Sequence, residues 1–107
     1  MKITEWFNHY KDYYPVGEGW RKIVDNLVRE IIKIDDKTEV TQVKEKFGTL
    51  RFYCSGDGRD EVHKLIEAAE QESGVTCERC GTKDKVTTKG SWLLTLCPKC
   101  RKDKRAN

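Results

Sequence analysis

The sequence predicts an α+β fold with two N-terminal helices, a β-hairpin, a third helix and a small C-terminal metal-binding module. Three observations support this prediction. Apolar residues recur at helical spacing in three segments, and a stretch of β-branched and alternating residues lies between the second and the third. Four cysteines near the end of the chain form two Cys-x-x-Cys pairs. A chain of 107 residues buries a small core, so a bound metal ion would add to its stability.

The first expected helix covers residues 3–14, with Thr4 as a candidate N-cap. Its apolar stripe is rich in aromatic residues, and such stripes usually pack on the core of the protein. A second interpretation is a protein-binding patch, because Trp and Tyr are enriched in interface hot spots. The residues that would form this patch are Trp6, Tyr10, Tyr13 and Tyr14.

The second expected helix follows a break at residues 15–19, where one proline and two glycines interrupt any continuous helix. It begins at Trp20 and has the clearest amphipathic pattern in the chain. We therefore expect it to be the main core helix. Its apolar face would consist of Trp20, Ile23, Val24, Leu27, Val28, Ile31 and Ile32.

The hairpin is expected to pair residues 38–46 with residues 50–54 across a turn at residues 47–49. Gly48 can adopt the positive φ that a tight turn needs. Val40 and Val43 do not share parity, so we expect the first strand to be bulged or to begin later. The outward face would carry a small cationic patch with one aromatic residue, which we interpret as ordinary surface charge: Lys44, Lys46, Arg51 and Tyr53.

The third expected helix follows a glycine-rich break at residues 55–58, which lacks the further ligands of a calcium loop. Its apolar face would hold Val62, Leu65, Ile66 and Ala69, and the helix would end near residues 73–74. His63 lies between two carboxylates on this helix. On a face this charged, a solvated histidine is the more common case than a catalytic one.

The four paired cysteines predict a single structural zinc ion. Sixteen residues separate the two pairs, and zinc accepts four thiolates in a tetrahedron without redox chemistry. The alternative is that these four cysteines form two disulfides or are four unrelated thiols. The fifth cysteine, Cys54, is expected to be a small apolar residue on a strand. The expected ligands are Cys77, Cys80, Cys97 and Cys100. The organisation expected is a body at residues 1–76 and a finger module at residues 77–107, packed together because residues 73–76 form a short link.

The expected module combines a knuckle at residues 77–81, a hairpin of residues 85–88 and 92–96, and a final helix. Cys97 would cap that helix, and Pro98 would take its first position, where a missing N–H costs nothing. This arrangement resembles the treble-clef zinc fingers of the GATA type. They share a Cys-x-x-Cys-Gly start, a Trp between the pairs and a Leu-Cys-x-x-Cys end followed by basic residues.

A second resemblance covers more of the chain, over most residues from 17 to 101. It is carried by Gly19-Trp20, by the segment from Val43 to Tyr53, by Ala69-Glu70 and Ser73, by Cys77-Glu78-x-Cys80-Gly81, and by Trp92…Thr95-Leu96-Cys97-x-x-Cys100. In these segments the chain is similar to small uncharacterised proteins encoded in bacteriophage and prophage genomes. The resemblance implies a phage accessory protein that binds host or defence machinery.

Two binding functions follow from these patterns. The first is a non-catalytic protein that engages a host or defence-system protein. The second is DNA or RNA binding, because residues 77–107 hold nine basic and three acidic residues, whereas residues 1–76 hold twelve and fifteen. The cations that would meet phosphates are Arg79, Lys83, Lys85, Lys89, Lys99, Arg101, Lys102, Lys104 and Arg105.

Catalysis is not expected. A nuclease of the HNH type needs histidines beside its finger, and residues 77–107 contain none. A zinc ion held by four cysteines also keeps no position open for a substrate or for water. We therefore predict no catalytic residues and no small-molecule substrate. The absence of a signal-peptide pattern and of a long apolar run predicts a cytoplasmic protein that does not contact membranes.

Overall fold

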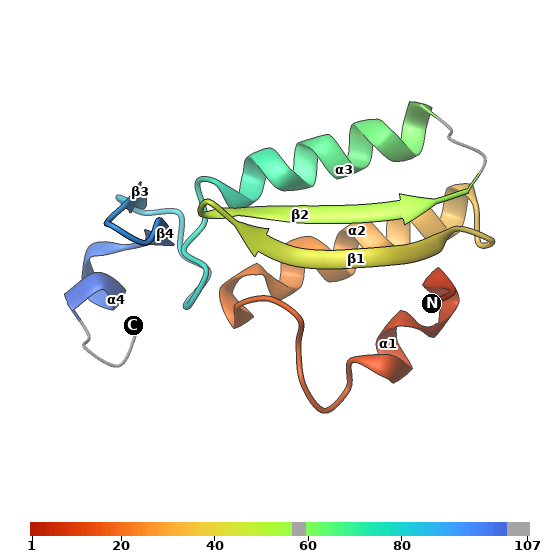
Figure 1. The fold of residues 1–107 in the computed structure, drawn as a ribbon, viewed down its shortest axis with the longest axis horizontal. Coiled ribbons are helices and arrows are strands. Elements are labelled where there is room, and N and C mark those ends of the chain that lie inside the picture. The colour runs from red at the N-terminus through yellow and green to blue at the C-terminus, as the bar shows by residue number, and fades with distance from the viewer. Residues whose placement is uncertain (57–59, 103–107) are drawn as a thin grey trace.

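The computed structural model describes residues 1–56 and 60–102, and it has the α+β architecture that the sequence predicts. In chain order, the body consists of a 3-10 turn Ile3–Glu5, α1 (Trp6–His9), a 3-10 turn Glu18–Trp20, α2 (Arg21–Ile34), β1 (Glu39–Lys46), β2 (Thr49–Ser55) and α3 (Asp60–Ser73). The cysteine-containing segment follows with β3 (Thr87–Lys89), β4 (Leu94–Leu96) and α4 (Pro98–Lys102). Figure 1 shows this segment at one end of the β1–β2 hairpin.

The first helix is shorter than expected. It ends at His9 instead of extending to residue 14, and Thr4 is not its cap. The difference has a tertiary cause. The indole N–H of Trp6 donates to Asp25 of α2 at 3.0 Å, and the Tyr14 hydroxyl donates to the same carboxylate at 2.6 Å. Because both side chains reach one residue, the chain between them turns back toward α2 rather than continuing as a helix.

Helix α2 is the core helix that the apolar pattern predicts. Its buried face carries Ile23, Val24, Leu27, Val28 and Ile31, whereas Ile32 is only partly buried. Trp20 is the last residue of the preceding 3-10 turn and is fully buried. Figure 1 shows α2 running behind the β1–β2 hairpin.

The hairpin is antiparallel, and its turn contains two residues rather than three. Phe47 has φ 54° and Gly48 has φ 84°, so both occupy the left-handed region that a twisted two-residue hairpin turn requires. Its tip closes with the pairing of Lys46 with Thr49. The predicted bulge is confirmed, because the register shifts between Val40 and Gln42.

The hairpin has one covered face and one open face. Leu50 and Phe52 are buried against the helices, and Val43, which pairs with Phe52, packs on the same core. Since side chains alternate along a strand, the remaining positions point the other way. We call this the outer face; its residues are Gln42, Lys44, Lys46, Thr49, Arg51 and Tyr53.

Helix α3 covers the free edge of β2. Ser73 Oγ accepts a hydrogen bond from Leu50 N at 2.8 Å, and Glu70 Oε2 accepts one from Phe52 N at 3.1 Å. His63 is exposed, in agreement with a solvated helix face. Asp57 and Gly58 of the glycine-rich break lie outside the described residues. Across residues 1–56 and 60–102, no helix has the length and apolar character needed to cross a membrane.

Candidate metal centre

Four cysteine sulfurs converge at the C-terminal end of the protein. Those of Cys77, Cys80, Cys97 and Cys100 all lie within 4.8 Å of one another, and none forms a disulfide. The Sγ atoms of Cys80 and Cys97 are 3.7 Å apart. A tetrahedral zinc ion with Zn–S bonds of about 2.3 Å places its sulfurs about 3.8 Å from each other. The cluster is therefore positioned to bind a metal ion, and its dimensions fit zinc.

The two Cys-x-x-Cys pairs share one local geometry. Cys80 N points at Cys77 Sγ at 3.5 Å, and Cys100 N points at Cys97 Sγ at 3.4 Å. Each turn is then closed by a backbone bond to the carbonyl of its first cysteine, at 2.9 Å in both cases. Helix α4 begins at Pro98, as the sequence predicts. Backbone N–H groups thus stabilise the charge of two sulfurs before any metal is considered.

The protonation of the metal-free cluster is uneven. Burial raises the pKa of Cys77, but backbone N–H groups of Cys80, Cys97 and Arg79 outweigh it and bring the pKa to about 6. Burial and the neighbouring cysteines raise the pKa of Cys100 to about 12. The cluster therefore holds a thiolate at neutral pH and still carries protons that a metal ion must displace, since only thiolates act as ligands.

The β3–β4 strand pair, which lies in the cysteine-containing segment, differs from the hairpin expected there. Thr88 pairs with Thr95 and Lys89 with Leu94, so strand pairing starts two residues later than expected on each strand. Four residues, 90–93, then form the turn, and Trp92 lies in this turn rather than in a strand. A side-chain contact explains this shift: the Thr88 and Thr95 hydroxyls are 2.6 Å apart, and their hydrogen bond fixes which residues of β3 and β4 pair.

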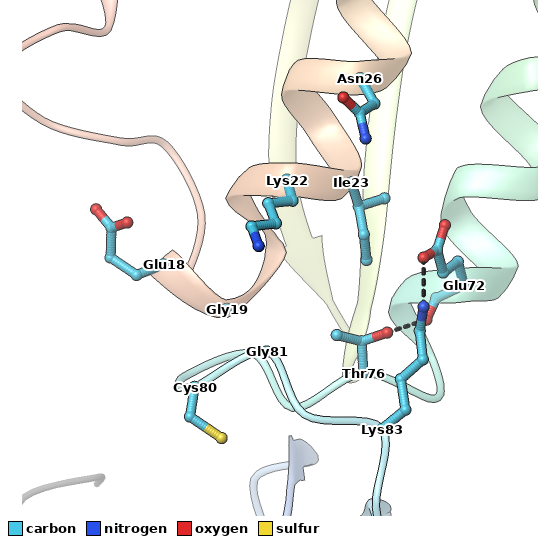
Figure 2. Close-up of a pocket in the computed structure, with 10 residues that line it drawn as sticks. All are labelled: Glu18, Gly19, Lys22, Ile23, Asn26, Glu72, Thr76, Cys80, Gly81 and Lys83. Carbon is cyan, nitrogen blue, oxygen red and sulfur yellow. Dashed lines mark hydrogen bonds and ion pairs between the residues drawn. The ribbon is translucent and has the colours of Figure 1, made fainter.

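The first Cys-x-x-Cys turn is docked on the body through glycine backbone. Gly19 N donates to Glu78 O at 3.0 Å, and Figure 2 shows Gly19 facing Gly81 of the turn. A Cβ on Gly19 would lie 2.0 Å from Cys77 O, and one on Gly17 would lie 2.1 Å from Glu78 O. Only glycine therefore allows this approach. We call this contact the glycine seam.

Side chains extend the glycine seam toward α3. The buried indole N–H of Trp20 donates to Thr76 O at 2.9 Å. Lys83 Nζ lies 2.6 Å from Glu72 Oε2, and the pair is visible in Figure 2. The polar cleft beside this seam is lined by two ion-paired carboxylates, because Glu18 pairs with Arg21 and Glu72 with Lys83. Lys22 also lines this cleft, and its side chain is exposed.

A second contact joins the β3–β4 pair to the tip of the β1–β2 hairpin. The hydroxyl of Thr95, which is fully buried, donates to Gly48 O. The Glu78 carboxylate accepts from Thr95 N at 3.0 Å, and burial raises the pKa of that carboxyl. A Cβ on Gly48 would lie 2.5 Å from the Thr88 side chain. These contacts fix the turn at residues 90–93 relative to the turn at Phe47 and Gly48.

The nine cations predicted to contact nucleic acid have different environments. Lys83 is paired with Glu72, and Arg101 is bound to backbone carbonyls inside the module. Lys104 and Arg105 lie outside the described residues. The others have exposed side chains: Arg79, Lys85, Lys89, Lys99 and Lys102.

Arg101 joins α4 to both strands of the β3–β4 pair. Its Nη2 atom donates to Thr87 O at 2.6 Å and to Leu94 O at 3.0 Å, and Nη1 donates to Lys89 O at 3.4 Å. A guanidinium carries its donors in a rigid fork, which suits several acceptors at once. The sequence-based prediction that Arg101 contacts phosphate is not tested by these bonds, which show that its guanidinium also has a structural role.

Replacing Arg101 with alanine is expected to lower the free energy of unfolding by about 1–2 kcal/mol, because charge-assisted hydrogen bonds are lost. Chemical denaturation of the zinc-loaded protein measures this. Lys99→Ala, an exposed change on the same helix, is the matched control and should change stability by less than about 0.5 kcal/mol. Equal effects of the two changes would contradict the role given to Arg101.

The aromatic residues of the N-terminal segment are mostly part of the core. Trp6 is fully buried and packs 5.9 Å from the ring of Phe52. Tyr10 and Tyr14 are half-buried, and burial together with the Asp25 bond raises the pKa of Tyr14. Tyr13 is 62% exposed. Of the four residues predicted for protein binding, Tyr13 is thus the one that faces solvent.

A different group of exposed apolar side chains lies where the two turns meet. Trp92 is 75% exposed, Phe47 is 65% exposed and Leu93 is 38% exposed. They line a cleft of about 430 Å³ together with Ser91 and residues 44–46 of β1, and we call it the tip cleft. Sequence reasoning missed it because Trp92 was placed in a strand and Phe47 in an ordinary turn. The segment Gly90-Ser91-Trp92 was the available signal, since Gly and Ser favour turns.

No protein-family model, no curated protein and no solved structure matches this chain.

Proposed function

We propose that this chain is a zinc-stabilised, non-catalytic binding protein that engages another protein through the tip cleft. The main support for this proposal is that Trp92 and Phe47 are exposed on two turns, and that buried hydrogen bonding holds these turns together. Large exposed aromatic side chains on a fixed scaffold are typical of interface hot spots, where Trp contributes most. Clustered exposed apolar residues also mark interaction sites more often than single ones.

Zinc has a structural role in this proposal. The four thiols would hold the ion and leave no position for water or substrate, so its contribution is folding energy. The ion would tie the Cys77–Cys80 turn to the segment that leads from β4 into α4. Since β3 and β4 carry the turn at residues 90–93, zinc would keep Trp92 beside the hairpin tip.

A protein partner is favoured over nucleic acid. Binding to nucleic acid depends on many cations that are free to meet phosphates. Lys83 and Arg101 have partners within the protein, so a phosphate would have to compete with Glu72 and with backbone carbonyls for these two cations. The exposed cations Lys85, Lys89, Lys99 and Lys102 keep DNA or RNA binding as the second candidate. The resemblance to phage-encoded proteins favours a host or defence-system protein as the partner.

The test places the photoreactive residue p-benzoylphenylalanine at position 92 of the zinc-loaded protein. After irradiation in a nuclease-treated bacterial lysate, we expect one discrete protein adduct. The same residue at position 13 is the matched control, because Tyr13 is similarly exposed but lies in the N-terminal segment. The adduct should also be lost when Phe47→Ser is added.

Two results would contradict the proposal. One is an adduct that forms in an untreated lysate but not in the nuclease-treated lysate, because it would identify the target as nucleic acid. The other is equal labelling from positions 92 and 13, because it would show that exposure alone determines the reaction.

A further inference from the structure

Building on the proposed function, we infer that the partner presents an acidic segment that carries one large apolar side chain. The apolar side chain enters the tip cleft, and the flanking carboxylates meet the outer face of the β1–β2 hairpin. Three observations carry this inference: the charge of the outer face, an unsatisfied arginine nitrogen on it, and the continuity of that face with the cleft.

Between residues 42 and 53 the charged side chains of the outer face are all cationic; Glu39, at the other end of the hairpin, is paired with the N-terminal amino group. Lys44 and Arg51 lie directly opposite each other across the two strands, and Lys46 lies opposite the neutral Thr49. Among the outer-face positions that the structure describes between residues 42 and 53, none holds a carboxylate. Like charges directly opposite each other destabilise a strand pair. An anionic partner would offset this cost.

Arg51 adds a second indication of a missing anion. Its Nε atom is buried, yet it has no hydrogen-bond partner within the described residues. A buried donor without an acceptor is costly, and native structures usually satisfy such groups. Arg51 as a whole is only partly buried, so a carboxylate laid along the outer face would reach its guanidinium from the solvent side, and a guanidinium favours paired oxygens.

The cationic outer face is continuous with the tip cleft. Lys44 and Lys46 belong to both, and Lys46 Nζ lies 5.5 Å from the centre of the Phe47 ring. Glu45 also lines the cleft, but its carboxylate accepts a hydrogen bond from Gly48 N at 2.7 Å. An apolar anchor between Phe47 and Trp92 would therefore have lysines, not free carboxylates, on its flank.

A peptide suits this surface better than a nucleic acid strand. Trp92 and Phe47 offer ring faces to either kind of ligand, but Leu93 adds a branched aliphatic wall, which packs on a side chain and does not stack on a base. A strand would also need cations that continue beyond the cleft along its backbone. Arg101 of α4, beside the cleft's β3–β4 pair, is instead bound to carbonyls of β3 and β4.

The fluorescence of Trp92 provides the measurement. Trp6 and Trp20 are fully buried, whereas Trp92 is 75% exposed, so the neutral quencher acrylamide reports mainly on Trp92. The probe is a short synthetic peptide with one Phe flanked by Asp and Glu on both sides. A peptide with Lys in place of each acid and a thymidine oligonucleotide are the comparison probes.

We expect the acidic peptide alone to protect Trp92 from acrylamide at low salt. The double variant Lys44→Ala/Lys46→Ala should raise the Kd about three- to tenfold, because exposed ion pairs each contribute a few tenths to one kcal/mol. Salt should weaken binding to the unmodified protein more than to this variant. The matched control Lys22→Ala/Lys64→Ala, on the helices that cover the opposite face, should bind like the unmodified protein.

Three outcomes would overturn the inference. Protection by the lysine peptide at equal concentration would remove the charge argument, and tighter protection by the oligonucleotide would assign the surface to nucleic acid. Protection by none of the probes would show that acid and an apolar anchor are not enough for recognition. A specific protein adduct at position 92 together with any of these results would leave the proposed function standing and refute only the partner chemistry.

Discussion

Cys97→Ser is expected to abolish stoichiometric zinc binding and to unfold the C-terminal third of the protein. Cys97 is buried, and its sulfur accepts a hydrogen bond from Cys100 N and lies 3.7 Å from the sulfur of Cys80. Structural zinc sites contribute about 10–16 kcal/mol of apparent binding energy at neutral pH, and this energy is folding energy. Loss of one ligand should therefore cost at least about 3 kcal/mol of stability.

Elemental analysis and thermal unfolding of the purified variant measure these two effects together. Cys54→Ser is the matched control, because Cys54 is a half-buried free cysteine on β2 and is not part of the cluster. It should keep one zinc ion per chain. A Cys97→Ser protein that retained stoichiometric zinc and the melting temperature of the unmodified protein would refute the assignment.

Among substitutions that add a single methyl group, Gly19→Ala is expected to lower the stability of the protein most. The new Cβ would lie 2.0 Å from Cys77 O and 2.7 Å from Gly81 N. These are backbone atoms, so the clash cannot be relieved by a side-chain rotation, and the first Cys-x-x-Cys turn must move away from the body. The hydrogen bond from Gly19 N to Glu78 O would then be lost. We expect a cost of about 3 kcal/mol or more, the range of severe packing defects.

Two readouts separate the glycine seam from the metal site. Gly19→Ala should keep its zinc, because no ligand is altered, but its denaturation midpoint should fall. Gly56→Ala is the matched control, since the nearest atom to its new Cβ would be 3.7 Å away. If Gly19→Ala were as stable as Gly56→Ala, the seam would not matter for stability.

The parts of the fold that sequence predicted are those set by local pattern. The apolar face of α2 has a helical period, the hairpin has a bulge where Val40 and Val43 change parity, and the four cysteines have ligand spacing. Each of these signals lies within one segment of the chain. Local periodicity and spacing are therefore enough to predict them.

The parts that sequence did not predict depend on contacts between distant segments. The aromatic stripe at the N-terminus has a helical period, but Asp25 of α2 binds both Trp6 and Tyr14 and shortens the helix. Arg101 lies in a basic run that suggests phosphate binding, yet carbonyls of β3 and β4 are within its reach. Neither partner can be identified without knowing which residues the fold brings together.

The contacts that join the cysteine-containing segment to the rest of the chain also have a consequence for the order in which the chain folds. The indole of Trp20 hydrogen-bonds to a carbonyl 56 residues later, and Gly48 to a hydroxyl 47 residues later. Contacts of such long sequence separation form late, because the entropy of closing the loop has to be overcome first. On a ribosome, the core helix therefore emerges well before the groups that complete its packing. Packing of the core helix is therefore completed only after the segment that holds the four cysteines has been synthesised.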